Sequence, residues 1–353
     1  MTLKERIEAG ILGKYAGLAN GLNRANNYLF GLQRSTYYLL GGLSGTYKSM
    51  LCDYMVQNAL ADAKRKNIEC NVHYYSFEID KLSKECNWLA NAVYNKYDRV
   101  IPIEKVKGMG FNPEKPETFD KGLNLEEQQM VISCIDEVQE EMDKIHFTWE
   151  TVNPTGVFHD LWKFALTRGT LQYEEYTNGG GEIKKKIVGY TPNNPDAYNL
   201  VVLDHIFLAR KELEFNKKDV IDKLSEYFIT LRNLFGFTII VVQQFNQGLS
   251  SVERQKFKGA DISPSQNDFR DSTNPYQDCD VALGTLNAAK LDMVKCLDYD
   301  ITKLGDNFIM LKIIKNRLSK DNIAIGLYAV PKGGYFIELP KASEINYDDF
   351  KKD

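Results

Sequence analysis

The sequence predicts an α/β protein whose mostly parallel central sheet is covered by helices on both faces. The first observation is a set of continuous apolar runs, clearest at 198–209 and 237–246. Runs that are apolar at every position, rather than at alternate ones, are typical of parallel strands buried on both faces. The second is that amphipathic helical segments alternate with these runs. The third is size, because 353 residues that are 43% hydrophobic can bury a substantial core.

The individual elements follow from residue periodicity and from turn residues. Leu3, Ile7 and Ile11 recur every four residues and predict an amphipathic helix over 2–12, which packs on the core or docks on a neighbour. Further helices are expected at 49–66, 82–97, 125–145, 155–169 and 219–236. Strands are expected at 36–42, 71–80, 146–152, 198–209, 237–246, 279–287, 308–317 and 323–339.

The chain shows no internal repeat, so these elements predict one α/β domain. The expected limits are a lead-in and linker helix at 1–30, the domain at 31–345 and a tail at 346–353. Two insertions are expected within the domain. One is largely helical, near 102–143, and the other is a β-hairpin near 170–195 that turns around Gly179–Gly181.

Charge and composition exclude several classes of protein. The net charge of −4 gives no overall basic field for nucleic acid, although a local basic loop can still bind it. No apolar run approaches the roughly 20 residues of a membrane span, and the N-terminus is not a signal peptide. We therefore expect a cytoplasmic protein with no membrane contact.

The cysteines predict neither disulfides nor a zinc module. They are scattered, without a C-x-x-C pair or a neighbouring histidine pattern, at Cys52, Cys70, Cys86, Cys134, Cys279 and Cys296. We expect them to be reduced thiols in the core.

The stretch "LLGGLSGTYKS" at 39–49 lies between a predicted strand and a predicted helix. In a phosphate-binding loop, backbone N–H groups at a helix N-terminus face the anion, a lysine adds charge, and the next hydroxyl binds Mg²⁺. The residues in those places are Gly42, Ser44, Gly45, Thr46, Tyr47, Lys48 and Ser49. Tyr47 stands where the pattern has its last glycine. An ATP site and a simple glycine-rich turn therefore both remain open from this stretch alone.

Two carboxylates follow predicted strands downstream of this loop. Asp204 ends the run "LVVLD", an arrangement that places a carboxylate beside Mg²⁺, although such runs are also common elsewhere. Glu78 in "YYSFEID" can orient the attacking water, or can simply lie near a helix N-terminus. His205 is expected to be a packing residue rather than a ligand.

Gln244 ends the buried strand at 237–246, where a polar side chain can contact a γ-phosphate. Gln243 should point to the opposite face, because side chains alternate along a strand.

The order of these blocks closely resembles the RecA-like motor domain of DnaB-type replicative DNA helicases. That family has a P-loop, then S-[LF]-E, then an apolar run ending in Asp, then one ending in Gln. The segment 263–284 looks like its DNA-contacting block, and "LKIIKNRLS" at 311–319 looks like its K-x-R element. The resemblance covers roughly residues 13–340.

The resemblance implies a RecA-like P-loop NTPase fold and an ATP-dependent, Mg²⁺-dependent helicase, encoded by a bacteriophage and acting in the host cytoplasm. It implies a homohexameric ring in which Lys315 and Arg317 reach the ATP of the adjacent subunit, with Arg317 as the arginine finger. Partners would be single-stranded or forked DNA, with a primase or a loader. DNA would lie against the loop near 246–272, which carries Arg254, Lys256, Lys258 and Arg270.

Three departures from the family keep other functions open. Besides Tyr47, Gln247 stands where these helicases often have arginine, and Thr273 stands where they usually have glycine. Phage recombinases of the RecA superfamily resemble this chain in tolerating an aromatic residue before the P-loop lysine. The alternatives are a strand-exchange filament protein and a nucleotide-binding structural or regulatory protein with weak hydrolysis.

Overall fold

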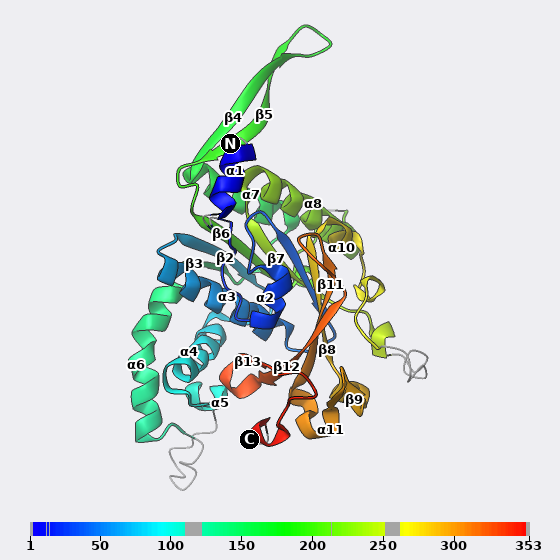
Figure 1. Ribbon diagram of the computed structural model, residues 1–353. Helices are drawn as coiled ribbons and strands as arrows, with labels where there is room; N and C mark the ends of the chain where they lie inside the picture. The colour runs from blue at the N-terminus through cyan, green and yellow to red at the C-terminus, as the bar shows by residue number, and fades with distance from the viewer. Residues whose placement is uncertain are drawn as a thin grey trace.

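A twisted nine-stranded sheet forms the centre of the part of the chain that the structure covers (Figure 1). The computed structural model describes residues 3–11, 13, 15–109, 122–212, 214–250 and 262–350. The strand order is β13-β12-β11-β8-β1-β7-β6-β2-β3. The strands are β1 (Tyr37–Gly42), β2 (Cys70–Ser76), β3 (Ile145–Thr148), β6 (Tyr198–Asp204), β7 (Thr238–Gln244), β8 (Val281–Asn287), β11 (Phe308–Asn316), β12 (Ile323–Val330) and β13 (Tyr335–Glu338).

The sheet is parallel from β8 to β3 and antiparallel beyond β8. Strand β1 pairs in parallel with both β7 and β8, and β6 pairs in parallel with β7 and β2. Strands β11, β12 and β13 continue the sheet with antiparallel pairing. The expected mostly parallel sheet is confirmed. The segment predicted as one strand over 323–339 is two strands, because a turn at Pro331–Gly333 separates β12 from β13.

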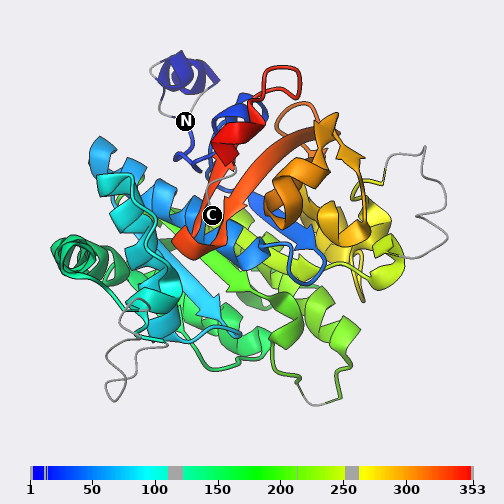
Figure 2. The same cartoon turned by 90° about the horizontal axis from the view of Figure 1, so that it is seen from below.

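Helices cover both faces of the sheet (Figures 1 and 2). The α-helices are α1 (Leu3–Ile11), α2 (Asn23–Leu29), α3 (Lys48–Lys66), α4 (Lys81–Tyr97), α5 (Ile103–Val106), α6 (Leu125–Met142), α7 (Pro154–Thr167), α8 (Lys217–Phe235), α10 (Asn274–Asp278) and α11 (Ile301–Leu304). Within the described residues, none of these helices has the length and apolar character needed to cross a membrane.

The alternation of side chains along β1 shows why the sheet has a core on each side. Tyr37 and Leu39 pack with α7 and α8 in one hydrophobic cluster. Tyr38 and Leu40 pack with α3 in the other. Because every residue of β1 is buried, the strand reads as a continuous apolar run, which is the pattern expected for a central parallel strand.

Both segments predicted as insertions contain the expected kind of structure. In the first, α6 packs against α4, and residues 110–121 lie outside the described part of the chain. In the second, β4 (Gly169–Thr177) and β5 (Ile183–Pro192) form an antiparallel hairpin that projects from the body of the molecule (Figure 1). The division into lead-in, domain and tail stays a prediction.

Candidate nucleotide-binding site

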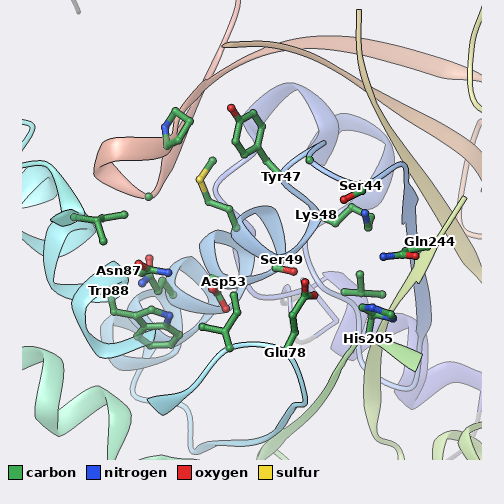
Figure 3. A pocket seen from close by; sticks show the side chains of 18 residues that line it. Ser44, Tyr47, Lys48, Ser49, Asp53, Glu78, Asn87, Trp88, His205 and Gln244 are labelled. Atoms are coloured by element: carbon green, nitrogen blue, oxygen red, sulfur yellow. The ribbon is translucent and has the colours of Figure 1, made fainter. Parts of the chain in front are cut away.

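A pocket lies at the carboxyl ends of the parallel strands, beside the first turn of α3 (Figure 3). Such an edge of an open α/β sheet is where ligands bind in this architecture. The lining includes these residues singled out from the sequence: Ser44, Gly45, Tyr47, Lys48, Ser49, Glu78 and Gln244. Gly42 and Asp204 are the last residues of β1 and β6 at this same edge. Segments far apart in the chain therefore converge here.

The loop between β1 and α3 has the backbone turn that a phosphate loop requires. Gly45 has φ 71°, and the Thr46 hydroxyl donates to the Leu43 carbonyl at 2.8 Å. Tyr47 precedes α3 with φ 57° and ψ 30°, which is the left-handed region that glycine favours. Tyrosine therefore adopts the glycine conformation at this position, at a cost of about 1–2 kcal/mol.

Lys48 is buried at the start of α3. Its Nζ donates to the Leu43 carbonyl at 2.7 Å. Burial lowers the pKa of Lys48 to about 8, while the carboxylates of Asp204 and Glu78 act in the opposite direction. The ammonium is thus held among the loop backbone and two carboxylates, where it can meet an anion without a long rearrangement.

Ser49 and Asp204 form the pair expected to hold Mg²⁺. The Ser49 hydroxyl donates to Asp204 Oδ1 at 3.0 Å. Asp204 is 1% exposed, and its Oδ2 accepts no hydrogen bond from the described residues. A buried, unpaired carboxylate oxygen next to a hydroxyl fits a hard cation, since Mg²⁺ prefers oxygen ligands.

Glu78 and Gln244 approach the loop from two other strands. Glu78 follows β2, and its carboxylate points toward Ser49 in Figure 3. Gln244 lies across the pocket near His205, which also lines it. Gln243 turns away, as the alternation predicts, and its Nε2 donates to the carbonyls of Arg270 at 2.7 Å and Ser272 at 3.0 Å.

A buried ionic cluster behind the pocket was not anticipated from the sequence. Lys84 of α4 is fully buried, and its Nζ donates to Asp53 Oδ1 at 2.7 Å and to the Tyr74 hydroxyl at 2.8 Å. The same Nζ lies 3.7 Å from Asp204 Oδ2. Burial opposes the charge of Lys84, but Asp53 and Asp204 outweigh it and raise the lysine pKa.

No local signal marks this cluster in the sequence. Lys84 occupies an ordinary polar position between Ser83 and Glu85 in a helical segment. Asp53 lies four residues after Ser49 on α3, so helical spacing places the two on one face, and this is the one clue that the sequence offered.

The remaining predicted site residues are not in this pocket. Lys315 Nζ donates to the carbonyls of Tyr276 at 2.6 Å and Gln277 at 2.9 Å, and Arg317 pairs with Asp280 at 3.4 Å. Both lie at the end of β11, outside the lining of their own chain's pocket.

Among the predicted DNA-binding residues, only Arg270 lies in the described part of the chain. Arg254, Lys256 and Lys258 fall outside it. Arg270 is exposed, pairs with Asp271 at 3.0 Å, and places its guanidinium 4.7 Å from the centre of the Phe207 ring.

Comparison with known proteins gives a fold but no sequence family. No family model and no curated protein matches the chain. One similar solved structure is the ATPase domain of a phage helicase, with a TM-score of 0.65, 14% identity and 96% of each chain covered. Another is a DnaB-like replicative helicase described with its interactions with primase, with a TM-score of 0.65, 14% identity, 96% of this chain and 65% of that one.

The chain therefore has the RecA-like fold of DnaB-type helicase ATPase domains, as the order of its motifs predicts. An identity of 14% shows a common fold, and the activity has to be argued from the site itself.

Proposed function

We propose that this chain is the ATPase motor of a replicative DNA helicase. In this proposal it forms a hexameric ring, moves along single-stranded DNA and unwinds duplex DNA in the cytoplasm of a bacterial host. The observation that carries the proposal is the convergence of Lys48, Ser49, Glu78 and Gln244 on one pocket at the carboxyl edge of a RecA-like sheet.

Each of these residues has a role that its position supports. The loop at 44–48 would hold the phosphates with its backbone N–H groups, and Lys48 would neutralise charge on the β- and γ-phosphates. Ser49 and Asp204, already hydrogen-bonded at 3.0 Å, would hold Mg²⁺, which neutralises phosphate charge when bound. Glu78 would orient the attacking water and accept its proton.

Gln244 would sense the γ-phosphate and connect the pocket to the proposed DNA-binding segment. The Arg270 backbone N–H donates to the Gln244 carbonyl at 3.1 Å, and the Asn246 N–H donates to the Asp268 carbonyl at 2.7 Å. The segment that carries Arg270 is thus attached directly to the strand end that faces the nucleotide.

The position of Lys315 and Arg317 supports a ring rather than a single working chain. Both side chains bond to the α10 region of their own chain and lie outside their own pocket. An arginine supplied by the next subunit can stabilise the transition state, and such a finger is worth about 10³–10⁵ in rate. The DnaB-like helicase of similar fold is described with primase, so a primase is the first protein partner to test.

The test is ATP hydrolysis with and without single-stranded DNA, together with unwinding of a forked duplex. We expect DNA to stimulate phosphate release and Lys48→Ala to abolish both activities. Lys81→Ala, an exposed lysine of α4 that pairs with Glu85, is the matched control and should keep both. Hydrolysis that ignores DNA, with no unwinding, would contradict the proposal. Open filaments rather than closed rings in electron micrographs with ATP and DNA would favour a recombinase instead.

A further inference from the structure

Two of the chain's four histidines meet a carboxylate at the β3 edge of the sheet. His73 and His146 are register partners on the parallel strands β2 and β3, and Asp160 comes from α7, which covers these strands. One ligand atom from each of the three residues lies within 4.8 Å of the other two. None of the three lines the nucleotide pocket.

His73 is buried without a complete set of partners. Its side chain is 5% exposed, and its Nδ1 makes no hydrogen bond to any described residue. The ring packs edge-on against Phe164 at 4.3 Å and lies 5.2 Å from the His146 ring. A buried polar atom without a partner costs about 1–3 kcal/mol, so an imidazole in this position suggests an additional ligand.

Asp160 is already oriented in the manner of a metal-binding carboxylate. The Tyr75 hydroxyl donates to Asp160 Oδ2 at 2.6 Å, so the carboxylate has a hydrogen-bonded second partner of the kind that fixes metal ligands. His146 is exposed, and it leaves the cluster open to solvent on one side.

The nearest cations are engaged elsewhere. Arg168 pairs with Glu69 at 3.0 Å and lies over the Phe164 ring, and Lys144 pairs with Glu140 at 2.9 Å. Neither forms an ion pair with Asp160 among the residues that the structure covers.

We propose that His73, His146 and Asp160 form a binding site for a divalent transition metal ion of the zinc class. Two imidazoles and one carboxylate are ligands that Zn²⁺ accepts, with water in the open position. Bonds of about 2.0–2.2 Å require the three ligand atoms to approach to roughly 3.3 Å from one another, and the exposed His146 side chain can make that movement.

This site goes beyond the proposed helicase function and is independent of it. The bound ion would connect the edge strand β3 and the helix α7 to β2. The sequence analysis expected no zinc because it considered the cysteines and local spacing. His73 and His146 are far apart in the sequence, and only the pairing of β2 with β3 brings them together.

The test uses the full chain stripped of metal, without nucleotide, titrated with Zn²⁺ by calorimetry and with Co²⁺ by visible absorption. We expect one equivalent to bind with the absorption of a histidine-ligated, low-symmetry Co²⁺ site, and Zn²⁺ to raise the midpoint of thermal unfolding. His146→Ala and Asp160→Asn should each weaken Zn²⁺ binding more than tenfold. Tyr75→Phe, which keeps all three ligands, should weaken it by about 10–100-fold.

His159→Ala is the matched control, since it removes a histidine of α7 outside the cluster and should leave Zn²⁺ binding unchanged. His146 is exposed, so its loss should leave the fold intact, which circular dichroism checks. Absence of a binding isotherm in the wild-type chain, or equal affinity in the wild type and His146→Ala, would overturn the site. These outcomes do not depend on ATP hydrolysis.

Discussion

Tyr47 has the left-handed backbone conformation that a glycine would otherwise supply at the start of α3. Its φ of 57° shows that the departure from the phosphate-loop pattern is in the side chain and not in the path of the backbone. The ring is half-buried, and it lines the pocket together with Met50. The loop can therefore present its N–H groups as a glycine-containing loop would.

Substitutions at Tyr47 should sort by their tolerance of positive φ. We expect Tyr47→Gly and Tyr47→Asn to retain ATP turnover, because both residues adopt the left-handed region readily. Tyr47→Val should lose at least about tenfold in kcat/KM for ATP, because a β-branched residue is strained there by about 1–3 kcal/mol. Phosphate-release kinetics make the comparison. Equal rates for the valine and glycine variants would contradict this account of the loop.

The lowered pKa of Lys48 predicts a pH dependence of nucleotide binding. With a pKa of about 8 in the free protein, Lys48 loses its charge as the pH rises above 8, whereas bound phosphates favour the charged form. Affinity for a nonhydrolysable ATP analogue should fall by up to about tenfold per pH unit above 8, with uptake of a proton on binding. Calorimetry in buffers of different ionisation enthalpy measures both. Lys48→Arg, which stays charged, should show neither effect.

The same shift has the opposite sign for stability. The folded pKa of Lys48 lies below its ordinary value of 10.5, so between about pH 8 and 10.5 the unfolded chain holds a proton that the folded chain has lost. Lys48 therefore destabilises the nucleotide-free protein below pH 8. This penalty is relieved as the pH rises through that window.

Lys84 should be a large contributor to stability for as long as Asp53 is charged. Lys84→Met leaves the buried Asp53 carboxylate without its cation, and breaking such a pair costs about 3–5 kcal/mol. The double variant Lys84→Met with Asp53→Leu should recover part of that loss, because the remaining groups are apolar. Urea unfolding of both variants is the measurement. A double variant no more stable than Lys84→Met would rule out this pairing energy.

At the scale of elements, the predictable parts were those with a one-dimensional signal. The apolar runs at β6 and β7 and the capped helices were visible, for example α8, where Asn216 and Asp219 form a reciprocal cap. The β9–β10 pairing of Lys295–Cys296 with Tyr299–Asp300 was missed, because two-residue strands have no periodicity to detect.

The candidate site divides in the same way. Lys48, Ser49, Asp204 and Gln244 each end or begin an element with a recognisable pattern, so the sequence placed them on one sheet edge. The Lys84–Asp53 contact depends on how α4 packs on α3, and the pairing of His73 with His146 depends on sheet order. Neither relation exists within a short stretch of sequence.

The β4–β5 hairpin should be dispensable for nucleotide chemistry. Leu171 and Tyr190 face each other across its base, and the Tyr190 hydroxyl donates to the Ala165 carbonyl at 2.7 Å, which anchors the base to α7. Replacing 172–189 with Asn-Gly gives a two-residue turn between these anchors. We expect nucleotide affinity to stay within about twofold, because the removed arms are mostly exposed and contribute little burial. Loss of nucleotide binding in a folded variant would show that the hairpin belongs to the core.

At the scale of the whole molecule, the separation of Arg317 from its own pocket predicts complementation between two inactive variants. Lys48→Ala lacks a working pocket, and Arg317→Ala lacks the proposed finger. In a randomly mixed ring, about a quarter of the interfaces pair an intact pocket with an intact arginine, because heterologous contacts repeat around the ring. We therefore expect the mixture to regain ATPase activity that neither variant has alone.

Two results would count against this shared site. One is Arg317→Ala hydrolysing ATP at the wild-type rate once assembled, and the other is a mixture that stays inactive although mass measurements show mixed rings. A mixture containing two different pocket variants, Lys48→Ala and Ser49→Ala, is the control that should not regain activity.

The opposed side chains at the end of β7 act as a short lever. Gln244 faces the pocket, while Gln243, one residue earlier, is bonded to the carbonyls of Arg270 and Ser272. A rotation of the strand end that follows the loss of a phosphate would displace the Arg270 segment through a single peptide unit. So stiff and short a linkage wastes little motion, and stroke and chemistry should remain in step at each turnover.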